Sequence, residues 1–320
     1  MAQAFGDVEV RPVDQLFGAD VNRDVIVVSR LCHPGYGWLP RYLTERGLRY
    51  AYFLDDNFWE LDESVDSYLA PFYTNPAVIG TLDEFIAGAG VVLVMSKRLR
   101  DYIVHRHPSA RVEYIVPGVD LDGIDASAAR LEHASRAAGE LRIGYPTSRR
   151  SNVTALLTQV IEGVRELHPQ GVYFEFVGWA PDDSAAVANV RVHPHIDTYD
   201  AYIHYALGRR WDIGIAPLLG SRFEVFKTQV KYREYGALGV AGVYSAVAPY
   251  VDYVDDGVTG LLVDNTVDGW VGALDRLIRF PELRAAIVAN ASEDVRCHFH
   301  QRDSAAEVRR LLLEIAPVHA

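Results

Sequence analysis

Short apolar runs alternate with stretches in which apolar residues recur every three or four positions along most of the chain. The first pattern is typical of buried strands and the second of amphipathic helices. Their regular alternation predicts βαβ units, and hence parallel sheets covered by helices on both faces. The strands predicted in this way lie at 8–12, 25–29, 50–54, 91–95, 112–116, 141–145, 172–177, 190–192, 213–217, 242–245 and 260–263.

The helical pattern fills most of the gaps between these strands. The polar, alanine-rich segment 119–140 follows the turn Pro117-Gly118 and marks a domain junction near residue 120. We therefore expect a Rossmann-like domain over 1–120 and a second one over 121–320, with a last helix able to pack back on the first domain. The predicted helices lie near 38–46, 82–89, 97–105, 127–136, 152–167, 199–207, 226–238, 267–278, 281–289 and 304–315.

Two doubly wound domains of this kind face each other across a cleft at the carboxyl ends of their strands, where such folds bind ligands. The second half has the length typical of this architecture. The first half is short, which predicts either the loss of an opening strand with its glycine-rich loop or a module cut from a longer chain.

The composition narrows the classes of molecule that the chain is expected to bind. The 320 residues carry a net charge of −12, which argues against a nucleic-acid polymer and leaves room for a local basic pocket that binds one small anion. Cys32 and Cys297 lie far apart and form no disulfide framework or zinc motif, so we expect reduced thiols in a cytoplasmic protein, with Cys297 packed in the interior. Neither a signal peptide nor a spanning helix is apparent, peripheral membrane association stays open, and the oligomeric state is not indicated.

The stretch 212–238 is the most informative part of the sequence. An apolar run of strand length is followed by the loop Gly220-Ser221 and by the helical pattern at 226–238, so the N–H groups that begin the helix should point above the sheet. On such a helix Lys227, Lys231 and Glu234 are spaced to share one face.

Two lysines at a helix start are unfavourable on their own. The helix dipole opposes each by about 0.3–1 kcal/mol, and their mutual repulsion adds about 0.2–0.5 kcal/mol. An anion docked on the helix start, such as a diphosphate, would reverse both effects. The alternative is two solvated lysines, with Lys231 and Glu234 forming a weak surface pair.

Polar side chains follow other predicted strands. Arg149 and Arg150 follow the strand at 141–145 and could grip phosphate oxygens, the alternative being a solvated loop. Asp55, Asp56 and Asn57 follow the strand at 50–54, where they could hydrogen-bond sugar hydroxyls or provide a base. A metal site and an N-cap role for Asp56 or Asn57 are the alternatives there.

Gly178 ends the strand at 172–177, where a base or ribose could lie over the backbone. His193 and His195 follow the next strand and would bind a metal only with a third ligand, so backbone contact with a nucleobase is an equal alternative. Arg30 and His33 are cleft candidates of lower weight. The motifs of serine hydrolases, P-loop enzymes, zinc proteases and dinucleotide-binding dehydrogenases do not occur.

Taken together, the second half resembles the nucleotide-sugar domain of GT-B glycosyltransferases, closest to glycosyltransferase family 4. The resemblance implies that Glu234 holds the ribose hydroxyls and that Lys231, with Lys227 or an arginine of the pair 149–150, neutralises a diphosphate cradled by the amides of Lys227 and Thr228. It also implies transfer without a metal or cofactor. The segments that carry the resemblance are 213–218, 226–239, 243–245 and 256–263, with 142–145, 174–178, 24–30 and 54–59.

The resemblance predicts a cytoplasmic enzyme that moves a sugar from a nucleoside-diphosphate sugar to a hydroxyl of a polysaccharide, glycolipid or natural product, with retention of configuration. Asp55, Asp56 and Lys231 are its expected catalytic residues. Eight positions before Glu234, retaining members carry a glutamate for the donor sugar, whereas this chain has Phe226, which leaves the donor sugar open. The alternatives are a non-catalytic nucleotide-sugar-binding module, half of a larger transferase, and an epimerase or phosphorylase on the same scaffold.

Overall fold

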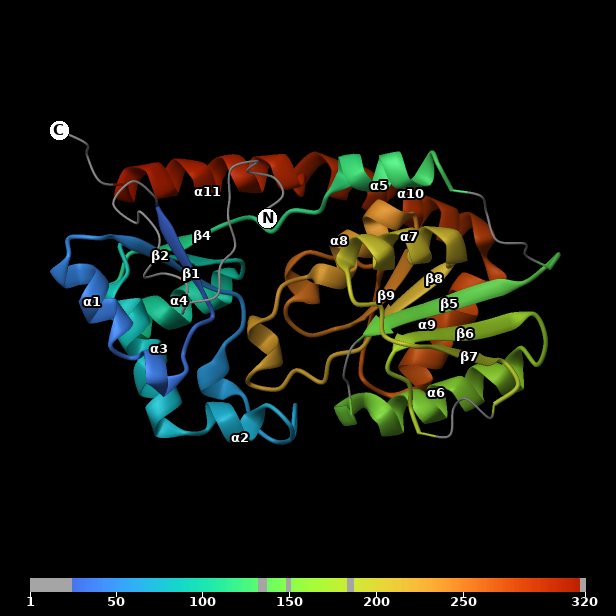
Figure 1. Cartoon of the computed structure of the whole chain (residues 1–320). Helices are drawn as coiled ribbons and strands as arrows, with labels where there is room; N and C mark the ends of the chain where they lie inside the picture. The colour runs from blue at the N-terminus through green and yellow to red at the C-terminus, as the bar shows by residue number, and fades with distance from the viewer. Residues whose placement is uncertain (1–24, 132–136, 148–150, 183–186, 317–320) are drawn as a thin grey trace.

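The computed structural model describes residues 25–131, 137–147, 151–182 and 187–316. The described chain forms two parallel sheets that lie side by side (Figure 1). The first has the order β1-β2-β3-β4, and the second has the order β10-β9-β8-β5-β6-β7. The strands are β1 Ile26–Ser29, β2 Tyr50–Leu54, β3 Val91–Val94, β4 Val112–Tyr114, β5 Leu141–Thr147, β6 Val172–Gly178, β7 Val190–His193, β8 Ile213–Ala216, β9 Ala241–Ser245 and β10 Leu261–Val263.

The second sheet has the strand order of a Rossmann domain. The chain begins at the centre with β5, moves outward through β6 and β7, and then returns to the other side of β5 to add β8, β9 and β10. The order therefore reverses between β5 and β8, and the crevice outside the carboxyl ends of these two strands is where such domains bind ligands. The predicted architecture of two α/β domains facing each other is confirmed.

Helices cover both faces of the second sheet, because each buries one apolar stripe (Figure 1). On α6, for example, the residues Leu157, Val160, Ile161 and Val164 are buried at helical spacing. The helices are α1 Leu39–Glu45, α2 Ala70–Tyr73, α3 Pro76–Gly88, α4 Lys97–Arg106, α5 Leu121–Ala128, α6 Thr154–Leu167, α7 Tyr199–Arg209, α8 Val230–Leu238, α9 Val267–Arg279, α10 Pro281–His298 and α11 Gln301–Ile315. None of the described helices is long and apolar enough to cross a membrane.

The last helix returns to the first sheet. Helix α11 crosses from the second domain and lies along the first (Figure 1). Val308, Leu311 and Ile315 of this helix share a buried cluster with residues of the first sheet. The chain passes from one domain to the other twice, near residue 119 and near residue 300. The two crossings lie side by side, because the backbone of Val119 hydrogen-bonds with that of Phe299 and Gln301. These contacts hold the two domains together.

Several predicted bounds are wrong. The helix predicted at 127–136 lies earlier, at α5, because the Asp120 carboxylate accepts a hydrogen bond from the Gly123 amide and starts the helix there. Helix α10 continues to His298, nine residues beyond the predicted end at 289. Cys297 is exposed rather than packed, whereas Cys32 is buried. The strand predicted at 8–12 and residues 132–136 lie outside the described residues.

A network of charged side chains is buried beside the second sheet. Glu175 of β6 is fully buried and accepts hydrogen bonds from Arg209 Nε and Trp211 Nε1, each at 2.9 Å. Arg191 bridges Glu175 and Glu140, with distances of 3.0 and 2.7 Å from its Nη1. Buried carboxylates are costly unless they are paired in this way. Burial alone would raise the pKa of Glu140, but hydrogen bonds from Arg191 and a second arginine lower it to about 2.

This network predicts an acid-sensitive contribution to stability. Because the pKa of Glu140 falls from 4.5 to about 2 on folding, its contribution is complete above pH 4.5 and is lost as the pH falls toward 2. We expect Glu140→Gln to lower the free energy of unfolding at pH 7 by on the order of 2–3 kcal/mol, and by much less at pH 3. Urea unfolding at both pH values measures this. Glu166→Gln, which removes an exposed carboxylate of α6, is the control, and an equal loss at both pH values would contradict the prediction.

Candidate active site between the two domains

The segment between β8 and α8 belongs to both domains. It leaves the second sheet at its carboxyl end, and Phe223 then enters the buried core of the first domain. Phe226 packs edge-on against Tyr102 of α4, with the ring centroids 5.2 Å apart. Glu224 is fully buried between them and accepts hydrogen bonds from the amides of Leu219 and Ser221, so it holds the loop in shape. The two phenylalanines thereby fix the position of the loop across the cleft.

This anchoring shifts the start of the helix. Residues Glu224–Phe226 form a 3₁₀ turn, and Lys227 is extended, with a ψ of 162°. Helix α8 begins only at Val230, so the amides free of helical partners are those of residues 230–232. The expectations that Lys227 and Thr228 supply the helix-start amides, and that Lys227 shares a helix face with Lys231, are therefore wrong.

Lys231 and Glu234 form the expected pair, but in a buried setting. Lys231 Nζ donates to Glu234 Oε2 at 2.8 Å, and the side chains are 21% and 7% exposed, so the alternative of a solvated surface pair is wrong. Tyr202 of α7 donates its hydroxyl proton to the same oxygen at 3.1 Å. Burial and the neighbouring Glu234 raise the pKa of Tyr202 well above its usual value, which keeps it a donor. Sequence reasoning missed Tyr202, although it lies on a predicted helix.

Lys227 reaches the opposite domain. Its Nζ donates to Asp56 Oδ1 at 3.0 Å, and both side chains are largely buried. Asp56 follows β2 at the carboxyl end of the first sheet, so the structure brings together two residues that the sequence placed in the cleft independently. The sequence predicts a diphosphate as the anion beside Lys227. In this structure the anion beside it is the Asp56 carboxylate.

Asp55 is held by the first domain. It forms an ion pair with Arg30, whose backbone lies in the left-handed region with a φ of 53°. Such a conformation is unfavourable for a residue other than glycine and is often found at functional sites. Burial and the adjacent Asp56 raise the pKa of Asp55. Its Oδ1 is buried, and within the described residues it has no hydrogen-bond partner.

The alternatives for this acidic segment are not supported by its contacts. Asn57 precedes the 3₁₀ turn Phe58–Glu60 but makes no side-chain cap, and its buried amide has no partner within the described residues. Asp55 and Asp56 each face a different cationic side chain, and no group of three metal-ligating side chains occurs among the described residues. His193 is therefore not part of such a group, and burial lowers its pKa.

Gly178 lies where the sequence placed it, at the end of β6. Its φ is 89°, and a Cβ atom at this position would lie 2.5 Å from the carbonyl oxygen of Thr147 at the end of β5. Only glycine fits so close an approach. The loop that follows Thr147 contains Arg149 and Arg150, which lie outside the described residues.

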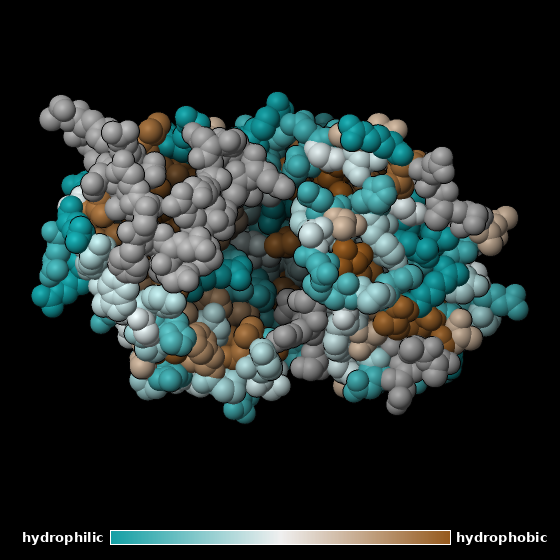
Figure 2. Space-filling model, in the orientation of Figure 1, coloured by the Kyte–Doolittle hydropathy of each residue, from teal (hydrophilic) through white to brown (hydrophobic). Residues whose placement is uncertain are grey.

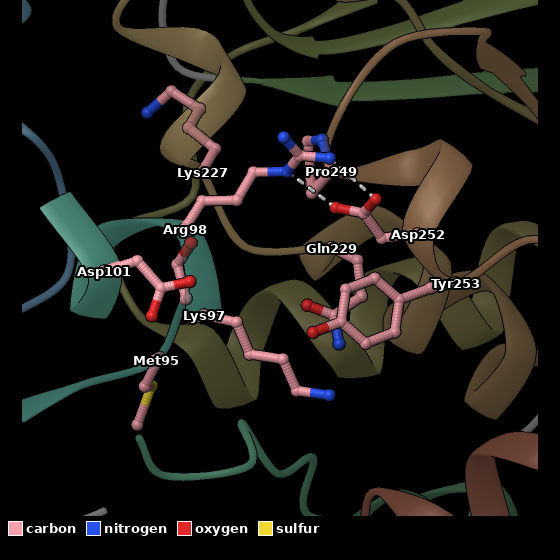
Figure 3. A pocket seen from close by; sticks show the side chains of 10 residues that line it. Met95, Lys97, Arg98, Asp101, Lys227, Gln229, Pro249, Asp252 and Tyr253 are labelled. Carbon is pink, nitrogen blue, oxygen red and sulfur yellow. Dashed lines mark hydrogen bonds and ion pairs between the residues drawn. The ribbon is translucent and has the colours of Figure 1, made fainter. Parts of the chain in front are cut away.

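A pocket of about 430 Å³ opens between the two domains (Figure 3). The space-filling view shows the surface hollowed along the same boundary (Figure 2). Arg98 and Asp252 close one side of the pocket through a bidentate ion pair, with both N···O distances 2.8 Å. A volume of this size suits a sugar-sized ligand. The pocket is lined by Met95, Ser96, Lys97, Arg98, Asp101, Lys227, Gln229, Pro249, Asp252 and Tyr253.

Sequence reasoning singled out only Lys227 of these lining residues for the cleft, yet the sequence contains a signal for another. Of the 31 basic residues, only three are lysines: Lys97, Lys227 and Lys231. Lys97 and Lys227 line the pocket, and Lys231 lies in the first turn of α8 beside it. An acidic, arginine-rich chain thus has all its lysines at the domain boundary.

No family model matches this sequence, and no curated protein is detectably similar to it. Solved structures are similar in fold. Sucrose-phosphate synthase from Thermosynechococcus elongatus has a TM-score of 0.67 at 16% identity, over 91% of this chain and 73% of its own. TarM of S. aureus has a TM-score of 0.67 at 14% identity, over 93% of this chain, which spans just over half, 57%, of TarM.

HepE of Anabaena, solved with UDP and glucose, has a TM-score of 0.65 at 13% identity, over 90% of this chain and 78% of its own. At such identities the likeness concerns the fold. Together with the two parallel sheets and the Rossmann strand order of the second, it establishes that this chain has the GT-B fold.

Proposed function

We propose that this protein is a glycosyltransferase that moves a sugar from a nucleoside-diphosphate sugar to a hydroxyl acceptor. The observation that carries the proposal is the cluster of Lys231, Glu234 and Tyr202 at the first turns of α8, beside the point where the strand order reverses. Two of the proteins that this chain resembles in fold, HepE and TarM, have been solved with UDP.

In this proposal the nucleotide lies on the second domain. Glu234 receives the ribose hydroxyls, and the diphosphate lies against Lys231 and the free amides of residues 230–232. Gly178 leaves space for the nucleoside, and Arg149 and Arg150 add donors to the phosphates. Lys227 exchanges its ion pair with Asp56 for one with the diphosphate, which releases Asp56 toward the acceptor.

The reaction follows from this placement. The bond between the anomeric carbon and the phosphate oxygen breaks, a bond from that carbon to the acceptor oxygen forms, and the acceptor proton passes to a phosphate oxygen. Lys231 and the helix amides stabilise the negative charge that develops on the leaving diphosphate, which is the role a metal ion would otherwise have. We therefore propose transfer without a metal or cofactor, with retention of configuration, and with Asp55 and Asp56 orienting the acceptor hydroxyl.

The donor sugar must be recognised without a glutamate at position 226. Phe226 packs against Tyr102 of the first domain. The nearby Glu224 is occupied by Asn152 and by two loop amides, so it is not available for a sugar. We infer that the donor sugar binds in the pocket between the domains.

A polysaccharide, a glycolipid and a natural product are the acceptor classes proposed, and the free thiols favour a reaction in the cytoplasm.

The first test concerns Lys231. Lys231→Ala should weaken UDP binding at least about tenfold, because a charge-assisted hydrogen bond to phosphate is lost. Isothermal titration calorimetry measures the affinity. Arg46→Ala, which removes an exposed cation at the end of α1, is the matched control and should leave the affinity unchanged. Equal UDP affinity of the wild type and Lys231→Ala would reject the diphosphate site.

The second test separates ribose from phosphate recognition. Glu234→Gln should weaken UDP binding by about fivefold or more, because a neutral amide is a poorer acceptor for two hydroxyls. Pyrophosphate has no ribose, so its affinity should stay within about twofold or improve as a negative charge is removed. Tyr202→Phe removes the hydroxyl that donates to Glu234 but leaves the carboxylate in place. Its UDP affinity should therefore lie between those of the wild type and Glu234→Gln. Equal losses for UDP and pyrophosphate would contradict the ribose role.

The third test concerns turnover. Transferases release nucleoside diphosphate slowly when water replaces the acceptor, so the purified chain should hydrolyse at least one common nucleoside-diphosphate sugar. Product analysis by chromatography measures free UDP or another nucleoside diphosphate, and Lys231→Ala should slow its release at least about tenfold. A chain that binds UDP but turns over no donor, with or without sugars as acceptors, is a binding module or half of a larger transferase. An isomerised donor would identify an epimerase.

A further inference from the structure

The pocket between the domains has a wall that the proposed nucleotide site does not use. Its first-domain side is formed by the start of α4, where Ser96 caps the helix by accepting a hydrogen bond from the Leu99 amide at 3.3 Å. Its second-domain side includes Gln229, the residue directly before α8. The N-terminus of α4, which is favourable for an anion, therefore faces the residue that precedes α8 across one pocket.

The charges around this pocket leave one cation uncompensated. Arg98 is paired with Asp252, and Asp101 is paired with Arg100 at 2.8 Å. Lys97 makes no ion pair with any described residue, and its Nζ lies 5.5 Å from the centre of the Tyr114 ring. Lys97 is exposed, and its side chain lines the pocket (Figure 3).

A second observation points independently to a ligand. Gln229 is fully buried, yet neither its Oε1 nor its Nε2 has a hydrogen-bond partner within the described residues. It does not cap α8 through its side chain. It is one of the residues that line the pocket (Figure 3). Leaving a buried amide unsatisfied costs about 1–3 kcal/mol, so such a group in a pocket wall indicates a bound partner.

We propose, on the basis of the proposed function, that this pocket binds a phosphate group of the acceptor substrate. Lys97 Nζ donates to its oxygens, the start of α4 adds its positive end, and Gln229 Nε2 donates once its side-chain amide turns into the pocket. The ammonium and the helix terminus come from the first domain and the amide from the second, so donors are available on both sides of the pocket, which suits the several acceptor oxygens of a phosphate. The substrate class is thus a phosphorylated sugar or alcohol, held between the domains while its free hydroxyl reaches the donor.

The test uses the whole chain with inorganic phosphate as the probe and saturating UDP in the donor site. Reductive ¹³C-methylation keeps the charge of lysine, and with three lysines in the chain it gives one resolved signal for each by NMR. Phosphate added to the UDP complex should shift the Lys97 signal and leave the Lys231 signal unchanged. UDP alone should shift the Lys231 signal.

Variants assign the binding site. Lys97→Ala and Gln229→Leu should each weaken phosphate binding to the UDP complex about fivefold or more, and Lys97→Arg should restore most of it. Both losing variants should bind UDP within about twofold of the wild type, which also shows that they are folded. Arg46→Ala should behave as the wild type in both titrations.

Four results would overturn the inference. Phosphate could fail to bind the UDP complex, could displace UDP, could shift Lys231 without Lys97, or could bind Lys97→Ala and Gln229→Leu as tightly as the wild type. If UDP itself does not bind, the proposed function fails first, which the UDP titration detects separately.

As a catalytic check, phosphorylated sugars should be better acceptors than the same sugars without phosphate, and Lys97→Ala should raise KM for the phosphorylated acceptor more than it lowers kcat.

Discussion

The loop between β8 and α8 is anchored by apolar contacts in the opposite domain, and the geometry of the cleft depends on that anchoring. Phe223 is buried in the core of the first domain, and Phe226 packs edge-on against Tyr102. Fully burying a ring such as that of Phe223 is worth roughly 1.5–3 kcal/mol. Because the loop cannot turn back toward its own sheet until residue 227, helix α8 begins late. Lys227 is thereby placed against the first domain, whereas Lys231 stays on the second.

The ion pairs of the molecule fall into two kinds with different consequences. The network around Glu175 is buried within one domain, and each of its charges has several hydrogen bonds, so it is part of the fold. Lys227–Asp56 and Arg98–Asp252 join different domains at the edge of the cleft. The half-exposed Arg98–Asp252 pair contributes little stability. Either pair can exchange one partner for a ligand that enters the cleft. The cleft charges are therefore suited to binding, and the buried ones to rigidity.

Net charge and local charge serve different purposes here. The chain is strongly acidic as a whole, yet its three lysines all lie at the domain boundary. Each of them faces something different: Lys227 a carboxylate of the opposite domain, Lys231 a carboxylate of its own helix, and Lys97 the open pocket. An acidic exterior disfavours long polyanions, while a cationic cleft attracts a small one. This division suits the proposed reaction, in which donor and acceptor both carry phosphate.

The sequence alone determined the fold class and most strands, because parallel strands buried on both faces appear as continuous apolar runs between helical patterns. It also placed Asp56, Gly178, Lys231 and Glu234 at strand ends or on the right helix, since spacing within one element is a local property. Only the tertiary structure decided that Lys227 precedes the helix, that Asp56 is its partner, and that Lys97 and Gln229 share a pocket. These facts depend on contacts between segments more than a hundred residues apart, so no local pattern of the sequence predicts them. Burying Phe223 in the other domain and packing Phe226 against it outweighs the helical preference of the residues between.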